Sequence, residues 1–170
     1  NAYIVWALTE SGEKGLAKEI AAVKASASST HDSYIIALGA NILQETGDQA
    51  GARQLMDKLA SNQDAAGNVK GGVTSITRSG GDALAIETTA LSVLAWMREP
   101  SYVDHVQRGL KWIVESNKSG RFGSTQSTIL ALRSTVAYDA SQARPKAPGR
   151  LRLKVDGDAS IAKPAFGGTI

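Results

Sequence analysis

The chain has no cysteine, only two phenylalanines and two histidines, and no long apolar run. Without cysteine it has no disulfide, no thiol nucleophile and no cysteine-ligated zinc. This absence leaves the compartment open, because exported bacterial proteins often lack cysteine as well. No segment approaches the ~20 consecutive apolar residues that a membrane helix needs, and no signal peptide opens the sequence. We therefore expect no membrane segment in these 170 residues.

Charge and size favour a single helical body without a nucleic-acid surface. Lysine and arginine number 19 against 16 acidic residues, and the net charge of +3 is spread along the chain. Because no basic stripe results, nucleic acid is not an expected partner. One domain of this length buries roughly 70% of its unfolded surface. With so little Phe, that core consists of Ala, Leu, Ile and Val.

Four segments repeat one pattern, a dense apolar run that opens in three cases on polar or hydroxyl residues. They are residues 2–8, 32–38, 87–91 and 126–132. Amphipathic stretches follow at 14–24, 49–60 and 102–114. Repetition on this scale predicts helical hairpins, with the apolar helix of each pair inside and the striped helix outside. The pattern predicts a mainly α fold, an incomplete alpha/alpha toroid of helical hairpins or a solenoid.

The composition changes after residue 140, which predicts the domain boundaries. Pro145, Pro148 and Gly149 indicate a linker over 141–149, and the period-two pattern of 150–158 predicts a strand. One strand is not stable alone. It is expected either to begin a β domain over 150–170 or to pair with 164–170. The toroid then covers 1–140, and its abrupt apolar start suggests a piece of a larger protein.

A glycine-rich segment, 65–81, separates two of the predicted hairpins. It has no phosphate-loop spacing and no preceding strand, so we expect an exposed loop or ribbon, with its role left open. His31 stands in a Ser29-x-x-Asp32 capping-box pattern, and His105 is expected to face solvent. Since neither histidine has metal-ligand spacing to a second ligand, no metal or cofactor site is expected.

Asp32, Glu87 and Gln126 occupy the same position of the repeat, at the predicted starts of the inner helices. If these starts share one end of the ring, the three polar side chains line that face. Paired carboxylates there can act as general acid and base. The same residue types also cap helices and offset the helix dipole, and a binding surface is a third interpretation. We favour capping and assign no catalytic residue.

Within 2–140, several motifs resemble the thioester-containing domain of the alpha-2-macroglobulin and complement family. Residues 111–113 are followed by 120–128, close to the family's W-I then G-G-F-x-S-T-Q-D-T pattern, and 86–94 and 2–8 match as well. The motif residues to which a structural role is assigned are Trp112, Gly120, Phe122, Gly123, Ser124, Thr125 and Gln126. Arg121 replaces a glycine and Ser127 the usual acid.

This resemblance implies an alpha/alpha toroid within a secreted or periplasmic protease-trapping inhibitor. In the family, a shielded thioester is exposed after a protease cuts the parent, and nearby nucleophiles are then acylated. The Cys-Gly-Glu-Gln thioester motif is absent from this chain, so no catalytic residue transfers to it. The implied role is packing, as the later half of the ring, with Trp6, Trp96 and Trp112 anchoring helices. The implied partners are other domains of the parent and, through it, target proteases.

Two other classes of protein fit parts of the pattern. The Gly-x-Phe-x-x-x-Gln spacing of 120–126 is similar to the repeat of terpene cyclases, which share the toroid with prenyltransferases. That enzyme reading lacks an Asp-rich motif and zinc ligands. A non-catalytic helical-repeat scaffold is the other alternative, and it predicts an open superhelix.

Overall fold

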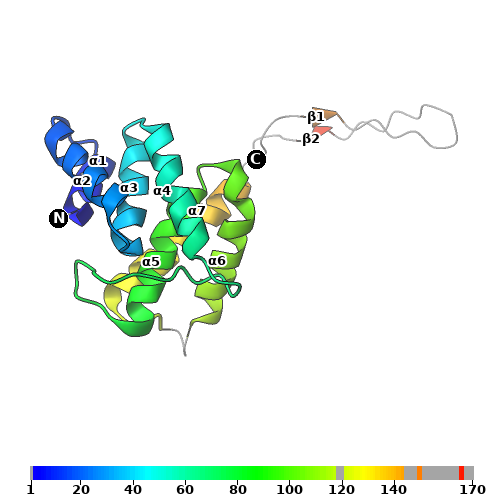
Figure 1. Ribbon diagram of the computed structural model, residues 1–170. Helices are drawn as coiled ribbons and strands as arrows, with labels where there is room; N and C mark the ends of the chain where they lie inside the picture. Colours follow the sequence, from blue (N-terminus) through cyan, green and yellow to red (C-terminus); the bar gives the residue numbers. More distant parts are fainter. Residues whose placement is uncertain (1, 118–120, 144–148, 151–164, 167–170) are drawn as a thin grey trace, which may run out of the picture. The chain divides into compact units, whose positions relative to one another are not determined.

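The computed structural model describes residues 2–117, 121–143, 149–150 and 165–166 (Figure 1). Clustering of the chain gives two compact units, Asn1–Val136 and Ala137–Ile170. The described residues are mainly α-helical, as the sequence predicts. The helices are α1 Ala2–Glu10, α2 Ala17–Ser29, α3 Ser33–Glu45, α4 Gln49–Asn62, α5 Gly81–Trp96, the 3-10 helix η1 Pro100–Tyr102, α6 Val103–Glu115 and α7 Thr125–Ala143.

Helices α2 and α5 begin at other residues than predicted, and glycines lie at or just before both starts. Helix α2 begins at Ala17 rather than Lys14, because Gly12 and Gly15 adopt φ angles of +81° and +83° that a right-handed helix does not contain. Helix α5 begins at Gly81, six residues before Glu87. The prediction that Glu87 stands at a helix start is therefore wrong: it lies inside the helix.

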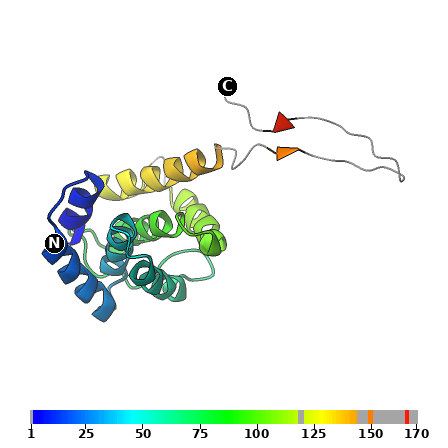
Figure 2. The ribbon, with the colours of Figure 1, turned by 90° about the horizontal axis from the view of Figure 1, so that it is seen from above.

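Helices α3 and α5 form the centre of the first unit and contact each other (Figure 2). Almost every residue of both helices is buried, including Tyr34 at 1% exposure and Leu91 at 0%. Helices α4 and α6 bury only one stripe each, formed by Leu55, Met56 and Leu59 and by Val106, Leu110 and Ile113. The expected arrangement, apolar helices inside and striped helices outside, is confirmed for these two hairpins.

Helices α1 and α7 depart from that arrangement. Each buries one face, with Trp6 at 3% and Leu130 at 1% exposure. The opposite faces carry large apolar side chains that are 37–65% exposed, namely Ile4, Leu8, Ile129, Leu132 and Val136. The prediction that the first helix of each pair lies inside therefore holds only for one face of the first and last of the four. Their exposed residues recur at helical spacing, so each forms a stripe.

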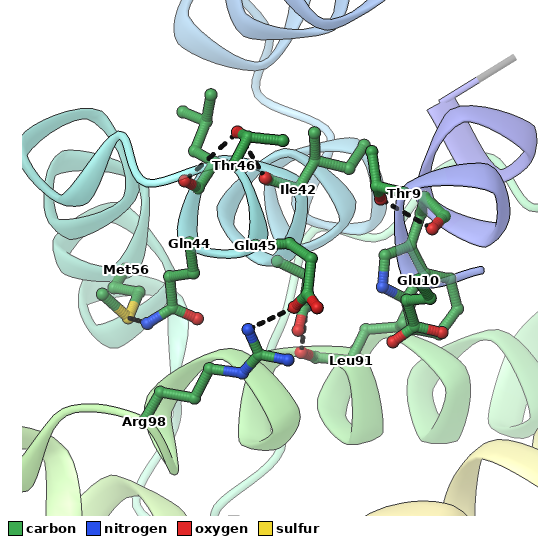
Figure 3. Close-up of polar contacts among 12 residues, drawn as sticks. Thr9, Glu10, Ile42, Gln44, Glu45, Thr46, Met56, Leu91 and Arg98 are labelled. Atoms are coloured by element: carbon green, nitrogen blue, oxygen red, sulfur yellow. Dashed lines mark hydrogen bonds and ion pairs between the residues drawn. The ribbon is translucent and has the colours of Figure 1, made fainter. Parts of the chain in front are cut away.

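Polar contacts also join the helices of the centre to their neighbours. The buried Asn41 amide donates to the Leu91 carbonyl at 2.9 Å, which links α3 to α5. Figure 3 shows Gln44 directed toward Met56 of α4 and Glu45 toward Arg98, just beyond α5. The Glu45–Arg98 pair is partly exposed, and such pairs contribute at most about 1 kcal/mol. Apolar burial, rather than these ion pairs, supplies most of the stability.

The tryptophans differ in how firmly they hold the helices. Trp96 is completely buried, and its indole N–H donates to the Met56 carbonyl at 3.2 Å. Trp6 is buried as well, with the guanidinium of Arg133 over its ring at 4.8 Å. Trp112 on α6 is only half-buried. Anchoring is therefore strongest at Trp96 and Trp6.

In the second unit, strand β1 Gly149–Arg150 pairs antiparallel with β2 Ala165–Phe166. The rest of the strand expected over 150–158 lies outside the described residues. Helix α7 continues to Ala143, three residues into the segment expected to be a linker. Among the described residues, no helix is both long and apolar enough to cross a membrane.

Candidate functional site

Asp32 caps α3 and also bonds the glycine-rich loop, residues 63–80, which joins α4 to α5. Its Oδ1 accepts from the Tyr34 and Val73 backbone amides at 3.0 Å. Its Oδ2 accepts from the Thr74 amide at 3.0 Å and from the Thr74 hydroxyl at 2.5 Å. The predicted capping role is confirmed, whereas the capping box is not, because the Ser29 hydroxyl donates back to carbonyls within α2. Sequence reasoning missed the loop contact.

Replacing Asp32 with alanine is expected to lower the free energy of unfolding by about 2–3 kcal/mol, because it removes a buried helix cap and the part-buried bonds to the Val73 and Thr74 amides. The matched control is Asp48→Ala at the start of α4, where the carboxylate caps Gly51 and is partly exposed. That change also removes an exposed ion pair with Lys24 and should still cost clearly less than Asp32→Ala. Urea unfolding of both variants measures the difference, and equal losses would show that the loop contact adds nothing.

The glycine-rich loop, residues 63–80, is fastened along much of its length. The Gly71 carbonyl accepts from the Ser33 amide at 2.9 Å, and the Val69 amide donates to the Thr89 hydroxyl at 3.0 Å. Val69 is buried, whereas Val73 is 73% exposed. The expected exposed loop is therefore only half correct, because its first part is packed against α3 and α5.

His105 helps to fasten the start of the loop, at Gln63. Its Nδ1 lies 2.7 Å from Gln63 Oε1, and the Gln63 amide donates to the His105 carbonyl at 3.0 Å. The imidazole is half-buried beside the Trp96 ring, with 5.2 Å between centroids. Burial, and then the charge of Arg108, lower the pKa of His105. The prediction that this histidine faces solvent is wrong, whereas His31 is exposed.

Glu87 is a carboxylate with no exposed surface at the junction of α5, the loop and the turn before α7. Its Oε1 accepts from the Ser79 hydroxyl at 2.6 Å and from the Ser124 hydroxyl at 3.2 Å. Its Oε2 is buried and has no hydrogen-bond partner within the described part of the chain. A buried polar side chain is costly unless it is bonded, so this junction depends on both serines. We call the Ser79–Glu87–Ser124 group the serine–glutamate junction.

The motif turn before α7 is built around Phe122 and Gly123. Phe122 is buried, and its carbonyl accepts from the Ser127 hydroxyl at 2.5 Å. Gly123 has a φ of +92°, and a Cβ there would lie 3.0 Å from the Ala83 side chain. The Ser124 hydroxyl accepts from the Ser127 amide at 3.0 Å, as a helix cap does. Thus the turn both starts α7 and packs on α5.

Gln126 joins α7 to α1, because its side-chain amide donates to the Tyr3 hydroxyl at 2.7 Å. The three predicted polar positions thus lie in one connected region: Asp32 and Glu87 bond the same loop, and Gln126 follows Ser124. No hydrogen bond joins them to one another among the described contacts. Thr125 is exposed and Trp112 lies apart on α6, while Gly120 lies outside the described residues.

Comparison with protein families identifies the domain to which this region belongs. The sequence model described as "A-macroglobulin TED domain" matches residues 1–138. The chain belongs to this family. This family comprises the thioester domains of alpha-2-macroglobulin and complement proteins, and its fold is an alpha/alpha toroid, as the motifs predict. No curated protein and no solved structure matches the chain.

Within this TED domain, the connected polar region joins α3 and α5 to the loop and to the turn before α7. Ser79 and Ser124 bond the buried Glu87, yet no histidine completes a nucleophile arrangement with them. The described residues contain no group of three side chains able to hold a metal ion. Ser127 is completely buried, and its hydroxyl donates to the Phe122 carbonyl. This hydroxyl therefore helps to hold the turn.

Proposed function

We propose that this chain is the structural half of the thioester domain of an alpha-2-macroglobulin-like protease inhibitor, and that the endopeptidase inhibitor activity belongs to the parent protein. The observation that supports this most is the serine–glutamate junction, which ties the family's motif turn to α5. The thioester cysteine would then stand elsewhere in the parent, because this chain has none.

The exposed stripes of α1 and α7 support the view that the ring is incomplete. Ile4 and Leu8 form one stripe, and Ile129, Leu132 and Val136 form the other. Exposed apolar area of this kind is typical of a surface that another element covers. In this proposal, the remaining helices of the parent's toroid pack on them.

The arrangement of the parent follows from the same proposal. Residues 1–140 are part of the toroid, 141–149 are a linker, and 150–170 begin a β domain. The other domains of the parent are the direct partners, and target proteases are reached through the parent. Its location is extracellular or periplasmic. We assign this chain no catalytic residue and no cofactor.

The parent protein provides the test. Methylamine should cleave its thioester and release one thiol, which a thiol reagent titrates, whereas the untreated parent should release thiol only slowly. Replacing Glu87 with alanine should loosen the junction and make spontaneous thiol release several-fold faster. The control is Arg98→Ala, which removes an exposed ion pair at Glu45 and should leave the rate unchanged.

Two results would contradict the proposal. A parent that releases no thiol with methylamine has no thioester, so the chain would be a structural relative without covalent chemistry. A parent that releases thiol equally slowly in the Glu87→Ala and Arg98→Ala variants would show that this half of the domain does not support the thioester.

A further inference from the structure

A cavity of about 220 Å³ lies between the starts of α1 and α3 and the outer part of the loop. This volume is far above the ~10–15 Å³ that a single water needs. The wall combines polar and apolar side chains. The lining residues are Ala2, Tyr3, Tyr34, Ile35, Leu38, Thr74, Ser75, Ile76 and Arg78.

Tyr34 brings an unused hydrogen-bond donor to this wall. The residue is 1% exposed, and its buried hydroxyl has no hydrogen-bond partner among the residues that the structure describes. Burial raises the pKa of Tyr34. The nearby Ile76 backbone amide lowers this pKa in part, but it forms no hydrogen bond of normal geometry with the Tyr34 hydroxyl. The hydroxyl therefore keeps its proton. Leaving a buried O–H without an acceptor costs free energy, so a ligand that accepts a hydrogen bond from it removes that cost.

Tyr3 and Arg78 add two further donors. The Tyr3 hydroxyl accepts from Gln126 at 2.7 Å, which leaves its own proton free to donate. Arg78 is exposed, forms no ion pair with any described residue, and is a non-glycine residue at a φ of +58°. Left-handed backbone is unusual for a residue with a side chain. The loop thus holds a guanidinium at the wall of the cavity.

The two carboxylates of the neighbourhood do not line this cavity. Asp32 already accepts from four donors, on Tyr34, Val73 and Thr74. Glu87 has no exposed surface and accepts from two serines. Among the described residues that line the cavity, Arg78 carries the charge, which favours a negatively charged group near it.

We propose that this cavity binds the carboxylate of a small apolar acid, either a free acid or the C-terminal residue of a peptide. The carboxylate accepts from Tyr34, Tyr3 and Arg78, since charge-assisted hydrogen bonds are the stronger ones. The apolar body lies against Ile35, Leu38 and Ile76. The site does not depend on the thioester and is independent of the proposed function.

The test uses the 170-residue chain and 3-phenylpropionate as the probe, followed by nuclear magnetic resonance of the methyl groups of Ile35, Leu38 and Ile76. Saturable binding is expected at a Kd of about 1 mM, a typical value for so small a ligand. Tyr34→Phe and Arg78→Gly should each weaken binding about tenfold. Glycine suits the left-handed backbone at position 78, so the loop is preserved.

Matched controls separate the carboxylate from the apolar body. Arg98→Ala removes the same charge far from the cavity and should leave Kd unchanged, while 3-phenylpropanamide should bind about tenfold more weakly than the acid. A tetrapeptide ending in Phe, with a free or an amidated terminus, distinguishes a peptide end from a free acid. The proposal is overturned by the absence of saturable shifts, by equal binding of acid and amide, or by unchanged binding in Arg78→Gly.

Discussion

Replacing Phe122 with alanine is expected to lower the free energy of unfolding by about 3–5 kcal/mol, the range for removing a buried phenylalanine. Phe122 is only 9% exposed, and the turn that it fills seats Ser124 against Glu87. The loss therefore combines a cavity with a weakened polar junction. Urea unfolding, followed by circular dichroism at 222 nm in the helical region, measures it.

Ile129→Ala is the control for this change. Ile129 lies on α7, the helix that this turn starts, and is 53% exposed, so its truncation should stay within about 0.5 kcal/mol, as for most surface substitutions. If Phe122→Ala costs less than ~1 kcal/mol, a value typical of surface sites rather than cores, the turn is peripheral and the junction does not hold α7.

Replacing Gly67 with alanine is expected to cost more than about 3 kcal/mol, because strain and a backbone clash add. The φ of Gly67 is +104°, and a Cβ there would lie 2.1 Å from the Arg108 carbonyl oxygen. Backbone on α6 cannot rotate away as a flexible side chain can. The loop would have to lift from α6 and lose the contact between Gln63 and His105.

Gly12→Ala is matched to this variant, because Gly12 also has a positive φ, +81°, but no atom within 4 Å of the added Cβ. It should therefore cost only the strain of left-handed backbone, about 1–2 kcal/mol. Thermal unfolding of the two variants in parallel provides the measurement. Equal losses would mean that the loop does not rest on α6 as described.

The helices and the inner position of α3 and α5 could be predicted from the sequence because apolar periodicity reports burial directly. Leu91 and Tyr34 lie in dense apolar runs and are buried, as predicted. The same signal is weaker for α1 and α7. A run of apolar residues does not reveal which of its faces a neighbour covers, so the exposure of Ile129 and Leu132 could not be predicted.

The polar contacts were harder to predict because they depend on distant residues. Glu87 bonds Ser79 and Ser124, 8 and 37 positions away, and no local spacing indicates such a pair. The start of α5 was misplaced since Gly80 and Gly81 are typical of loops. Asp32 was predicted correctly as a cap, because capping is local, while its bonds to Val73 and Thr74 span about forty residues of chain.

Native-state hydrogen exchange of the backbone amides tests most directly whether α3 and α5 are the hub of this toroid half. Their amides should exchange only through global unfolding, with protection at least about 100-fold higher than in α2 and α6, because local opening frees the outer elements first. Protection that is equal across the four helices, or higher in α2 and α6 than in α3 and α5, would contradict the division into inner and outer helices.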